Sequence, residues 1–221
     1  MKKRSKVIIK LVNDEINVSQ AFEILELLLE DINDKKIKNW LNSEINGYKD
    51  EKSVPQYRIL GANVKGDYIA GVYQCKNHDI PLKPEYVKKY SNINITYPIS
   101  QILQLSMAEK EGNSHCLNIP LHQVIAHDIS LINGEVISAY RELSIYAFTC
   151  LISKVKTKLL SIFKELEKQY GNLDDYYIDF TDKKKEEKIS KSLITIINDK
   201  STHIGDGNTL KESIIGDNNE N

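Results

Sequence analysis

The residue types best suited to catalysis meet in the stretch "WLNSEINGYKDEKSVPQYR", residues 40 to 58. Glu44 supplies a carboxylate before a polar loop, and Arg58 supplies a guanidinium after it. A carboxylate can serve as a general base and an arginine can bind phosphate, so one hypothesis is a hydrolase or nuclease-type toxin with Glu44 as base and Arg58 or Arg141 on the phosphate. Glu44 has no second acid or metal partner beside it, so this hypothesis has little support and catalytic residues stay unknown.

A second group of reactive side chains consists of His115, Cys116, His122, His127 and Asp128. Histidine, cysteine and aspartate are the usual metal ligands. However, His122 and His127 would diverge by about 140 degrees on a helix, and the HExxH and HxxxH spacings do not occur. A Cys-His nucleophile pair is chemically feasible, yet no neighbouring residue singles out Cys116. We therefore predict no metal site and no cofactor.

Basic residues beside aromatic ones raise a third hypothesis, a nucleic-acid-binding module. The N-terminal run "MKKRSK" can contact phosphates, and the tyrosines of "PEYVKKYSN" can stack on bases. Against this, the 221-residue chain carries a formal net charge of -1, whereas a strongly basic binder would be clearly positive. The glycines of "GANVKGDYIAG" also lack the spacing of a phosphate-binding loop. Nucleic acid is therefore a weakly supported partner.

Composition and cysteine usage favour a globular protein of the cytoplasm. Hydrophobic residues make up 41% of the chain and charged residues 28%, which excludes a disordered acidic chain. The three cysteines are odd in number and form no CxxC pair, as expected for reduced thiols. Lys10 interrupts the apolar stretch that follows the N-terminal basic run, so we predict no export signal. No window is apolar enough to predict a membrane segment.

Two helices are predicted to carry the stretch 40 to 58. Residues 18 to 32 place apolar side chains at helical spacing, and Asn17 with Gln20 resembles a capping box at the start. A second helix opens at Asn33-Asp34 and ends at Asn46-Gly47, where glycine offers the left-handed conformation of a helix end. The short connection predicts an antiparallel helical hairpin.

The residues after Pro55 are rich in β-branched and aromatic side chains. We predict strands at 56 to 64 and 67 to 76, with the turn at Lys65-Gly66-Asp67. Pro84 is expected to open a short helix, because proline fits a first helical position. A further helix is predicted at 99 to 110.

The next stretch, from Cys116 onward, is ambiguous between strand and helix. Pro120 suits a helix start, so we favour a helix over 120 to 131. Asn133-Gly134 is expected to be a turn, and "EVISAYREL" fits a strand or the lead into the next element.

The strongest periodicity covers residues 144 to 170. Apolar residues alternate spacings of three and four, which predicts one long amphipathic helix that ends at Gly171. The apolar stripe is wider than a two-stranded coiled coil requires, which favours packing within the chain. Self-association through this helix remains the alternative, so a homo-oligomer is one expected state.

The chain beyond Gly171 changes in composition. "DDYYIDF" is a candidate last strand, and "TDKKKEEK" has the charge pattern of a solvated linker or helix face. "ISKSLITIIND" is too short to assign to strand or helix. In the tail, "IGDGN" from Ile204 recurs as "IGDNN" from Ile215. Such a repeat predicts two rungs of a small β-solenoid or a pair of turned strands. Neither can bury a core alone, so the tail is expected to dock on the domain, add to another chain or stay mobile.

These elements predict an α+β fold with an N-terminal helical hairpin, a central small antiparallel β-sheet with short helices, a long C-terminal amphipathic helix and a short β-repeat tail. The predicted organisation is one domain over 1–172, a charged linker with a short apolar element over 173–200, and the two-copy IGDxN repeat over 201–221.

Two blocks of the opening stretch carry a family resemblance. They are Trp-Leu-x-x-Glu-x-Asn-Gly-Tyr, from Trp40 to Tyr48, and Pro-x-Tyr-Arg, from Pro55 to Arg58. With the leading amphipathic helix and the long closing helix, they make residues 12 to 170 resemble the AbiTii domain. The resemblance implies a role in anti-phage defence, in which infection triggers growth arrest or death of the host cell, and a defence-system partner protein. It implies no catalytic mechanism.

The candidate functional residues are therefore the members of these two blocks, as a structural clasp or a binding surface: Trp40, Glu44, Asn46, Gly47, Tyr48, Pro55, Tyr57 and Arg58. A glutamate at a helix C-terminus opposes the helix dipole unless a cation compensates, and Arg58 is the expected cation. We expect a clasp between the helical and β parts. The leading functional hypothesis is a defence protein that acts by binding and self-assembly.

Overall fold

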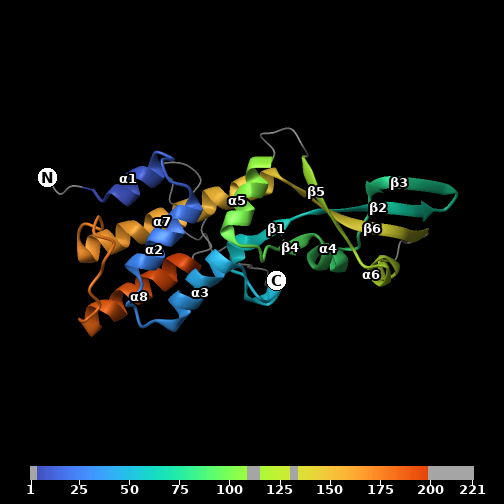
Figure 1. Cartoon of the computed structure of the whole chain (residues 1–221). Coiled ribbons are helices and arrows are strands. Elements are labelled where there is room, and N and C mark those ends of the chain that lie inside the picture. Colours follow the sequence, from blue (N-terminus) through green and yellow to red (C-terminus); the bar gives the residue numbers. More distant parts are fainter. Residues whose placement is uncertain (1–3, 109–114, 130–133, 199–221) are drawn as a thin grey trace, which may run out of the picture.

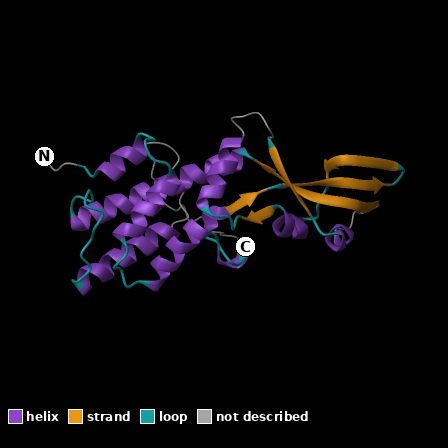
Figure 2. Cartoon of the chain, in the orientation of Figure 1, coloured by secondary structure: helices purple, strands orange, loops and turns teal. Residues whose placement is uncertain are grey.

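A helical body and a protruding β-sheet make up the molecule (Figure 1). The computed structural model describes residues 4–108, 115–129 and 134–198. Figure 2 shows the helices gathered at one end and the strands at the other. In chain order the elements are α1 (Lys6–Val12), α2 (Val18–Leu28), α3 (Lys35–Asn46), η1 (Glu51–Ser53), η2 (Gln56–Arg58), β1 (Ile59–Gly61), β2 (Asn63–Ala70), β3 (Tyr73–Asp79), α4 (Pro84–Tyr90), β4 (Asn92–Asn94), α5 (Ile99–Ala108), β5 (Cys116–Pro120), α6 (Gln123–Asp128), β6 (Gly134–Ser144), α7 (Tyr146–Tyr170) and α8 (Lys183–Asn198).

The predicted α+β class is confirmed, and so are its helical hairpin and long closing helix. The capping box is present at the start of α2: the Asn17 side chain accepts from the Gln20 backbone, and the Gln20 side chain accepts from the Asn17 backbone. α3 begins after its N-cap Asp34 and ends at Gly47, whose φ is 91°. Pro84 opens α4, and Gly171 follows α7 with a φ of 93°.

The long helix α7 forms the centre of the helical body. Its apolar side chains are buried against α1, α2, α5 and α8, so the wide stripe packs within the chain. These buried residues are Phe148, Leu151, Val155, Leu159, Ile162, Phe163 and Leu166. Burial of a leucine or phenylalanine side chain contributes about 1.5 to 3 kcal/mol, so this helix organises the main core.

The predicted boundaries of the strands after Pro55, and the predicted position of their turn, were wrong. Residues 56 to 58 form η2, and the hairpin is β2 with β3, turned at Gly71, whose φ is 61°. Gly66 is not a turn residue but lies in the middle of β2, between β3 and β6. A Cβ atom there would lie 1.9 Å from the backbone oxygen of Ser138, so glycine is required by the close approach of β6.

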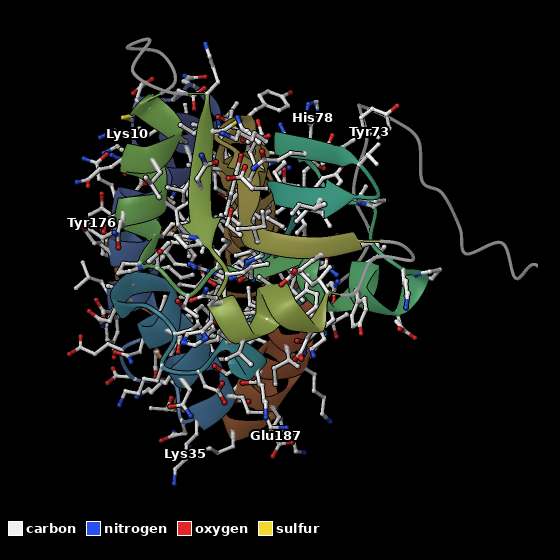
Figure 3. All side chains as sticks on the ribbon, turned by 90° about the vertical axis from the view of Figure 1, so that its right-hand side faces the viewer. Lys10, Lys35, Tyr73, His78, Tyr176 and Glu187 are labelled. Carbon is white, nitrogen blue, oxygen red and sulfur yellow. The ribbon has the colours of Figure 1, made fainter. Side chains whose placement is uncertain are left out.

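The four-stranded antiparallel sheet has the order β3-β2-β6-β5, and β1 pairs with β4 in a separate small sheet. α4 and α6 cover one face of the larger sheet and enclose a second, smaller core. Its buried members are Val64, Ile80, Tyr90, Ala126, Ile129, Val136 and Ala139. β3 lies at the free edge, and Figure 3 shows Tyr73 and His78 on this strand pointing into solvent.

Other local predictions also need correction. The helix expected over 120 to 131 is a strand that ends at Pro120 and a short helix, α6. "DDYYIDF" is not a strand but a loop, whose Ile178 and Phe180 pack into the main core. The apolar run after it is helical, and α8 packs on α7. The described residues do not include the helix end predicted at 111–113, the first residue of the turn predicted at 133, or the repeat predicted at 201–221.

Candidate functional site

Glu44 and Arg58 form a buried ion pair. Both side chains are 0% exposed. Arg58 Nη2 donates to Glu44 Oε2 at 2.6 Å, and Arg58 Nε donates to Glu44 Oε1 at 3.0 Å. This two-point geometry matches the planar guanidinium to the planar carboxylate, the strongest arrangement for such a pair. The two residues lie at the end of α3 and in η2, so the pair joins the helical hairpin to the start of the β part.

Two tyrosines complete the hydrogen bonding of the same carboxylate. The hydroxyls of Tyr48 and Tyr57 each donate to Glu44 Oε1 at 2.6 Å. Trp40 Nε1 in turn donates to the Tyr57 hydroxyl at 2.8 Å. The carboxylate therefore accepts four hydrogen bonds, counting the two from Arg58, and its charge is compensated without water.

Arg58 also fixes the segment that leads into α5. Its Nη1 donates to the backbone oxygens of Ile95 at 3.2 Å and Tyr97 at 2.6 Å. The guanidinium carbon lies 4.9 Å from the centroid of the Tyr48 ring, within cation–π distance. Because α3, η2 and the residues after β4 all contact one arginine, the cluster fixes the junction between the helical body and the sheets.

The end of the first motif block is shaped to close this cluster. Gly47 has a positive φ, and a Cβ there would lie 3.0 Å from the Thr96 backbone oxygen and 3.2 Å from Pro98 Cδ. The next amide, of Tyr48, donates to that same Thr96 oxygen at 2.8 Å. Glycine is thus needed both for the backbone conformation and for the close approach of the Thr96–Pro98 segment.

The environment of the cluster keeps the tyrosines protonated and the arginine charged. Desolvation and then the charge of Glu44 raise the pKa of Tyr57 well above its usual value, and the same causes raise the pKa of Tyr48. Burial by itself would lower the pKa of Arg58, but the ion pair and hydrogen bonds with Glu44 outweigh it and raise that pKa. The phenols therefore act as fixed donors.

The other predicted motif residues shape the backbone instead of joining the cluster. Asn46 is exposed, and its Nδ2 donates to Asn42 Oδ1 at 2.9 Å. Pro55 precedes η2 and accepts from the Arg58 amide at 2.9 Å. Arg141 lies on β6, in the sheet rather than in this cluster. The structure thus brings together Trp40, Glu44, Tyr48, Tyr57 and Arg58.

A family model named AbiTii matches residues 5–192, most of the chain. The chain belongs to the AbiTii family. The match extends beyond the predicted limits of 12 and 170, to α1 at one end and into α8 at the other. A search of curated proteins found no match, and a search of solved structures found none. Family membership indicates a role in abortive-infection defence against phage.

Sequence reasoning missed Lys158, which connects the cluster to the last turn of α8. Its Nζ lies 5.2 Å from the centroid of the Tyr57 ring and donates to the Ile196 backbone oxygen at 2.8 Å. That oxygen belongs to the last turn of α8, where a cation is favourable. A lysine on the polar side of a long helix has no sequence signal for such a role, because only the packing of α8 on α7 places the carbonyl there.

A second clasp at the start of the AbiTii match was also missed. Ser5 is fully buried, and its amide and hydroxyl donate to Glu167 Oε1 at 2.6 and 2.7 Å. Ser5 Oγ accepts from the Leu173 amide at 3.0 Å, and Arg4 pairs with Glu167 at 2.6 Å. Burial opposes ionisation of Glu167, but the Ser5 hydrogen bonds and Arg4 outweigh it and lower its pKa. The N-terminal basic run is therefore partly structural.

The five joined motif residues form a closed and buried hydrogen-bonded network. Tyr48 and Tyr57 are each 9% exposed and the ion pair is fully buried, so a substrate has no access to the carboxylate. Within residues 4–108, 115–129 and 134–198, no three His, Cys, Asp or Glu side chains come together as metal ligands. None of the helices in these ranges is long and apolar enough to cross a membrane.

Proposed function

We propose that this AbiTii protein acts in phage defence through binding and self-association in the cytoplasm, as a sensor, adaptor or effector, without catalysis by the motif cluster. One observation carries the proposal: the residues with the most reactive chemistry, Glu44 and Arg58, are completely buried and compensate each other. A general base must be within hydrogen-bond reach of its substrate. The same burial argues against the hydrolase alternative, in which Glu44 would be the base.

Self-association is assigned to the C-terminal repeat rather than to α7. The apolar stripe of α7 is already buried within the chain, so it has no free apolar face to offer a second copy. The two IGDxN copies at Ile204 and Ile215 lie beyond the family match. The repeat predicts two β-solenoid rungs or a pair of turned strands, which would be too few to bury a core, and repeats of other copies would supply the missing partners.

The full-length chain provides the test. Replacing both Ile204 and Ile215 by Asp puts a charge in each copy of the repeat without touching a residue of the described domain. We expect light scattering to show an assembly for the wild type and a monomer for the variant, and phage protection to be lost while the circular dichroism spectrum of the helical body is kept. The matched control replaces Thr209 and Asn221 by Asp, which adds the same two charges outside both IGDxN copies. A monomeric wild type, or a variant that protects cells as well as the wild type, would reject the proposal.

A further inference from the structure

One edge of the larger sheet is open. The strand order β3-β2-β6-β5 gives β3 a neighbour on one side, and no other described strand pairs with it. Along Tyr73–Asp79 every residue is exposed except Cys75, which is half-buried. Figure 1 shows β3 on the outer side of the protruding sheet. Because its outward N–H and C=O groups have no partner strand within the described ranges, this edge can pair with an added strand.

The most exposed apolar side chains of the described residues lie at the start of this edge. Val72 in the turn is 92% exposed, and Tyr73 beside it is 73% exposed. A solvated turn more commonly carries glycine, asparagine or aspartate than such side chains. Neighbouring exposed apolar residues instead mark a surface that contacts another protein segment.

Two protective features limit the open edge to its first half. A bulge places Lys76 and Asn77 of β3 opposite Asp67 of β2. Asn77 has a φ of 54°, and its amide donates to Asp67 Oδ1 at 2.8 Å. Bulges and lysines are features by which edge strands avoid unwanted pairing. The open part is therefore residues 72 to 75, which fits only a short partner strand.

The C-terminal repeat contains a short segment of suitable composition. Its second copy begins within "SIIGD", residues 213 to 217, where two isoleucines precede Gly216-Asp217. Adjacent β-branched residues favour a strand, and Gly-Asp favours a turn that ends it. The first copy has a single isoleucine, Ile204, between His203 and Gly205. The second copy is therefore the better strand.

Chain length also favours the second copy. The end of α8 is held on the helical body, where Lys158 Nζ donates to the Ile196 backbone oxygen at 2.8 Å. From Asn198 to Ile215 the chain can extend by about 56 Å, which exceeds the diameter of a small domain, about 30 Å. Ile204 is reached after only about 20 Å. The second copy can thus reach a neighbouring molecule.

We propose that residues 213 to 217 of one molecule add as a strand to residues 72 to 75 at the β3 edge of a second molecule. The inference rests on the self-association through the repeat proposed above, and it gives the second copy a strand of the AbiTii domain as its partner instead of another repeat. Main-chain hydrogen bonds hold the added strand, and its isoleucines contact Val72 and Tyr73. Because the tail and the edge are different surfaces, the contact is head-to-tail.

Backbone pairing at the edge is tested with Gln74→Pro in the full-length chain. Ala70 and Tyr73 flank a two-residue turn and are hydrogen-bonded to each other, so the next amide, of Gln74, points away from β2. Proline removes this donor without removing a bond between β2 and β3. We expect light scattering to show an assembly for the wild type and a monomer for Gln74→Pro. The matched control Gln74→Ser keeps the N–H and should assemble like the wild type.

A second edge variant tests the apolar contact and does not depend on how well the hairpin accepts proline. Val72→Asp combined with Tyr73→Asp changes only exposed side chains, so the circular dichroism spectrum should be unchanged. We expect this variant to be monomeric as well. In the tail, Ile215→Asp should weaken assembly at least about tenfold, because it puts a charge into the apolar contact. Its matched control, Ile204→Asp, should weaken assembly by about twofold or less, because the first copy does not contact the edge.

Mixing Gln74→Pro with Ile215→Asp separates head-to-tail pairing from contacts between repeats. The first variant has an intact tail and the second an intact edge, so the mixture should form heterodimers although each variant alone is monomeric. Assembly of both edge variants like the wild type, equal effects of Ile204→Asp and Ile215→Asp, or no heterodimer in the mixture would overturn this inference while leaving self-association through the repeat intact. A monomeric wild type would reject both proposals.

Discussion

The protein contains two clusters that combine buried tyrosine with arginine, and they differ in how their polar groups are satisfied. In the first, Arg58 and Tyr57 share the carboxylate of Glu44, and the ion pair has no exposed surface. In the second, the Tyr90 hydroxyl and Arg141 Nε have no partners in the described ranges, and the ammonium of Lys89 is exposed. The first network is completed by protein groups alone, whereas the second leaves two buried donors without a partner among the described residues.

The difference has an energetic basis. Burying a charge is costly unless it is paired and hydrogen-bonded, so a closed cluster such as Glu44 with Arg58 resists the loss of either partner. A buried donor without a partner instead costs about 1 to 3 kcal/mol, so removing it does not leave another group uncompensated. Substitutions of the same kind in both clusters should therefore have different consequences for stability.

The largest difference is expected between Arg58→Ala and Arg141→Ala. Removal of Arg58 leaves the Glu44 carboxylate buried without its cation, so unfolding free energy should fall by about 3 to 5 kcal/mol. Removal of Arg141 should change it by about 1 kcal/mol or less, because no carboxylate depends on it. Urea unfolding followed by circular dichroism measures both. Arg58→Lys keeps the charge but loses the two-point hydrogen bonding of the guanidinium, so its loss of unfolding free energy should be intermediate. Equal losses for Arg58→Ala and Arg141→Ala would contradict the difference between the two clusters.

A smaller difference is expected between Tyr57→Phe and Tyr90→Phe. Tyr57→Phe removes a hydrogen bond to a carboxylate and deprives Trp40 Nε1 of its acceptor, so we expect a loss of about 2 to 3 kcal/mol. Tyr90→Phe removes only a hydroxyl that has no partner within the described chain, and stability should be unchanged or slightly higher. Thermal and urea unfolding of the two variants in phosphate-free buffer provide the measurement. A clear loss in Tyr90→Phe would show that its hydroxyl has a structural partner.

The smallest effect is a pH dependence specific to the first cluster. The raised pKa of Tyr57 means that the folded protein keeps this phenol protonated, while the unfolded chain releases the proton above about pH 10. Its stabilising contribution is therefore complete below about pH 10 and declines above it, by about 1.4 kcal/mol per pH unit. The stability difference between wild type and Tyr57→Phe should accordingly shrink from about pH 9 to about pH 11. A constant difference across this range would mean that the folded pKa of Tyr57 is not raised.

Much of the helical architecture was predictable because its signals are local. The Asn17–Gln20 capping box, the start after Asp34 and the stop at Gly47 depend on a few neighbouring residues, and all three are present. The hairpin after Pro55 was placed wrongly because a glycine in a β segment can indicate either a turn or the close approach of a neighbouring strand. Gly71 supplies a turn, whereas Gly66 makes room for the backbone of β6, a strand far away in the sequence.

The motif cluster was predictable only in part. The position of Glu44 at a helix end calls for a cation, and the sequence predicts Arg58 as that cation. The carbonyls of Ile95 and Tyr97, and the place of Lys158 between Tyr57 and α8, have no sequence signal. These contacts join segments that meet only when the whole chain folds.

The sequence by itself determined the amphipathic helices, the caps and the residue types of both clusters, since each depends on side-chain identity and short-range spacing. Tertiary structure alone decided which polar groups are satisfied. Glu44 meets Arg58 because the loop through Gly47 returns the chain, while Arg141 reaches β4 without meeting a described carboxylate. Hydrogen bonds form over about 3 Å, so partners distant in sequence are settled by packing.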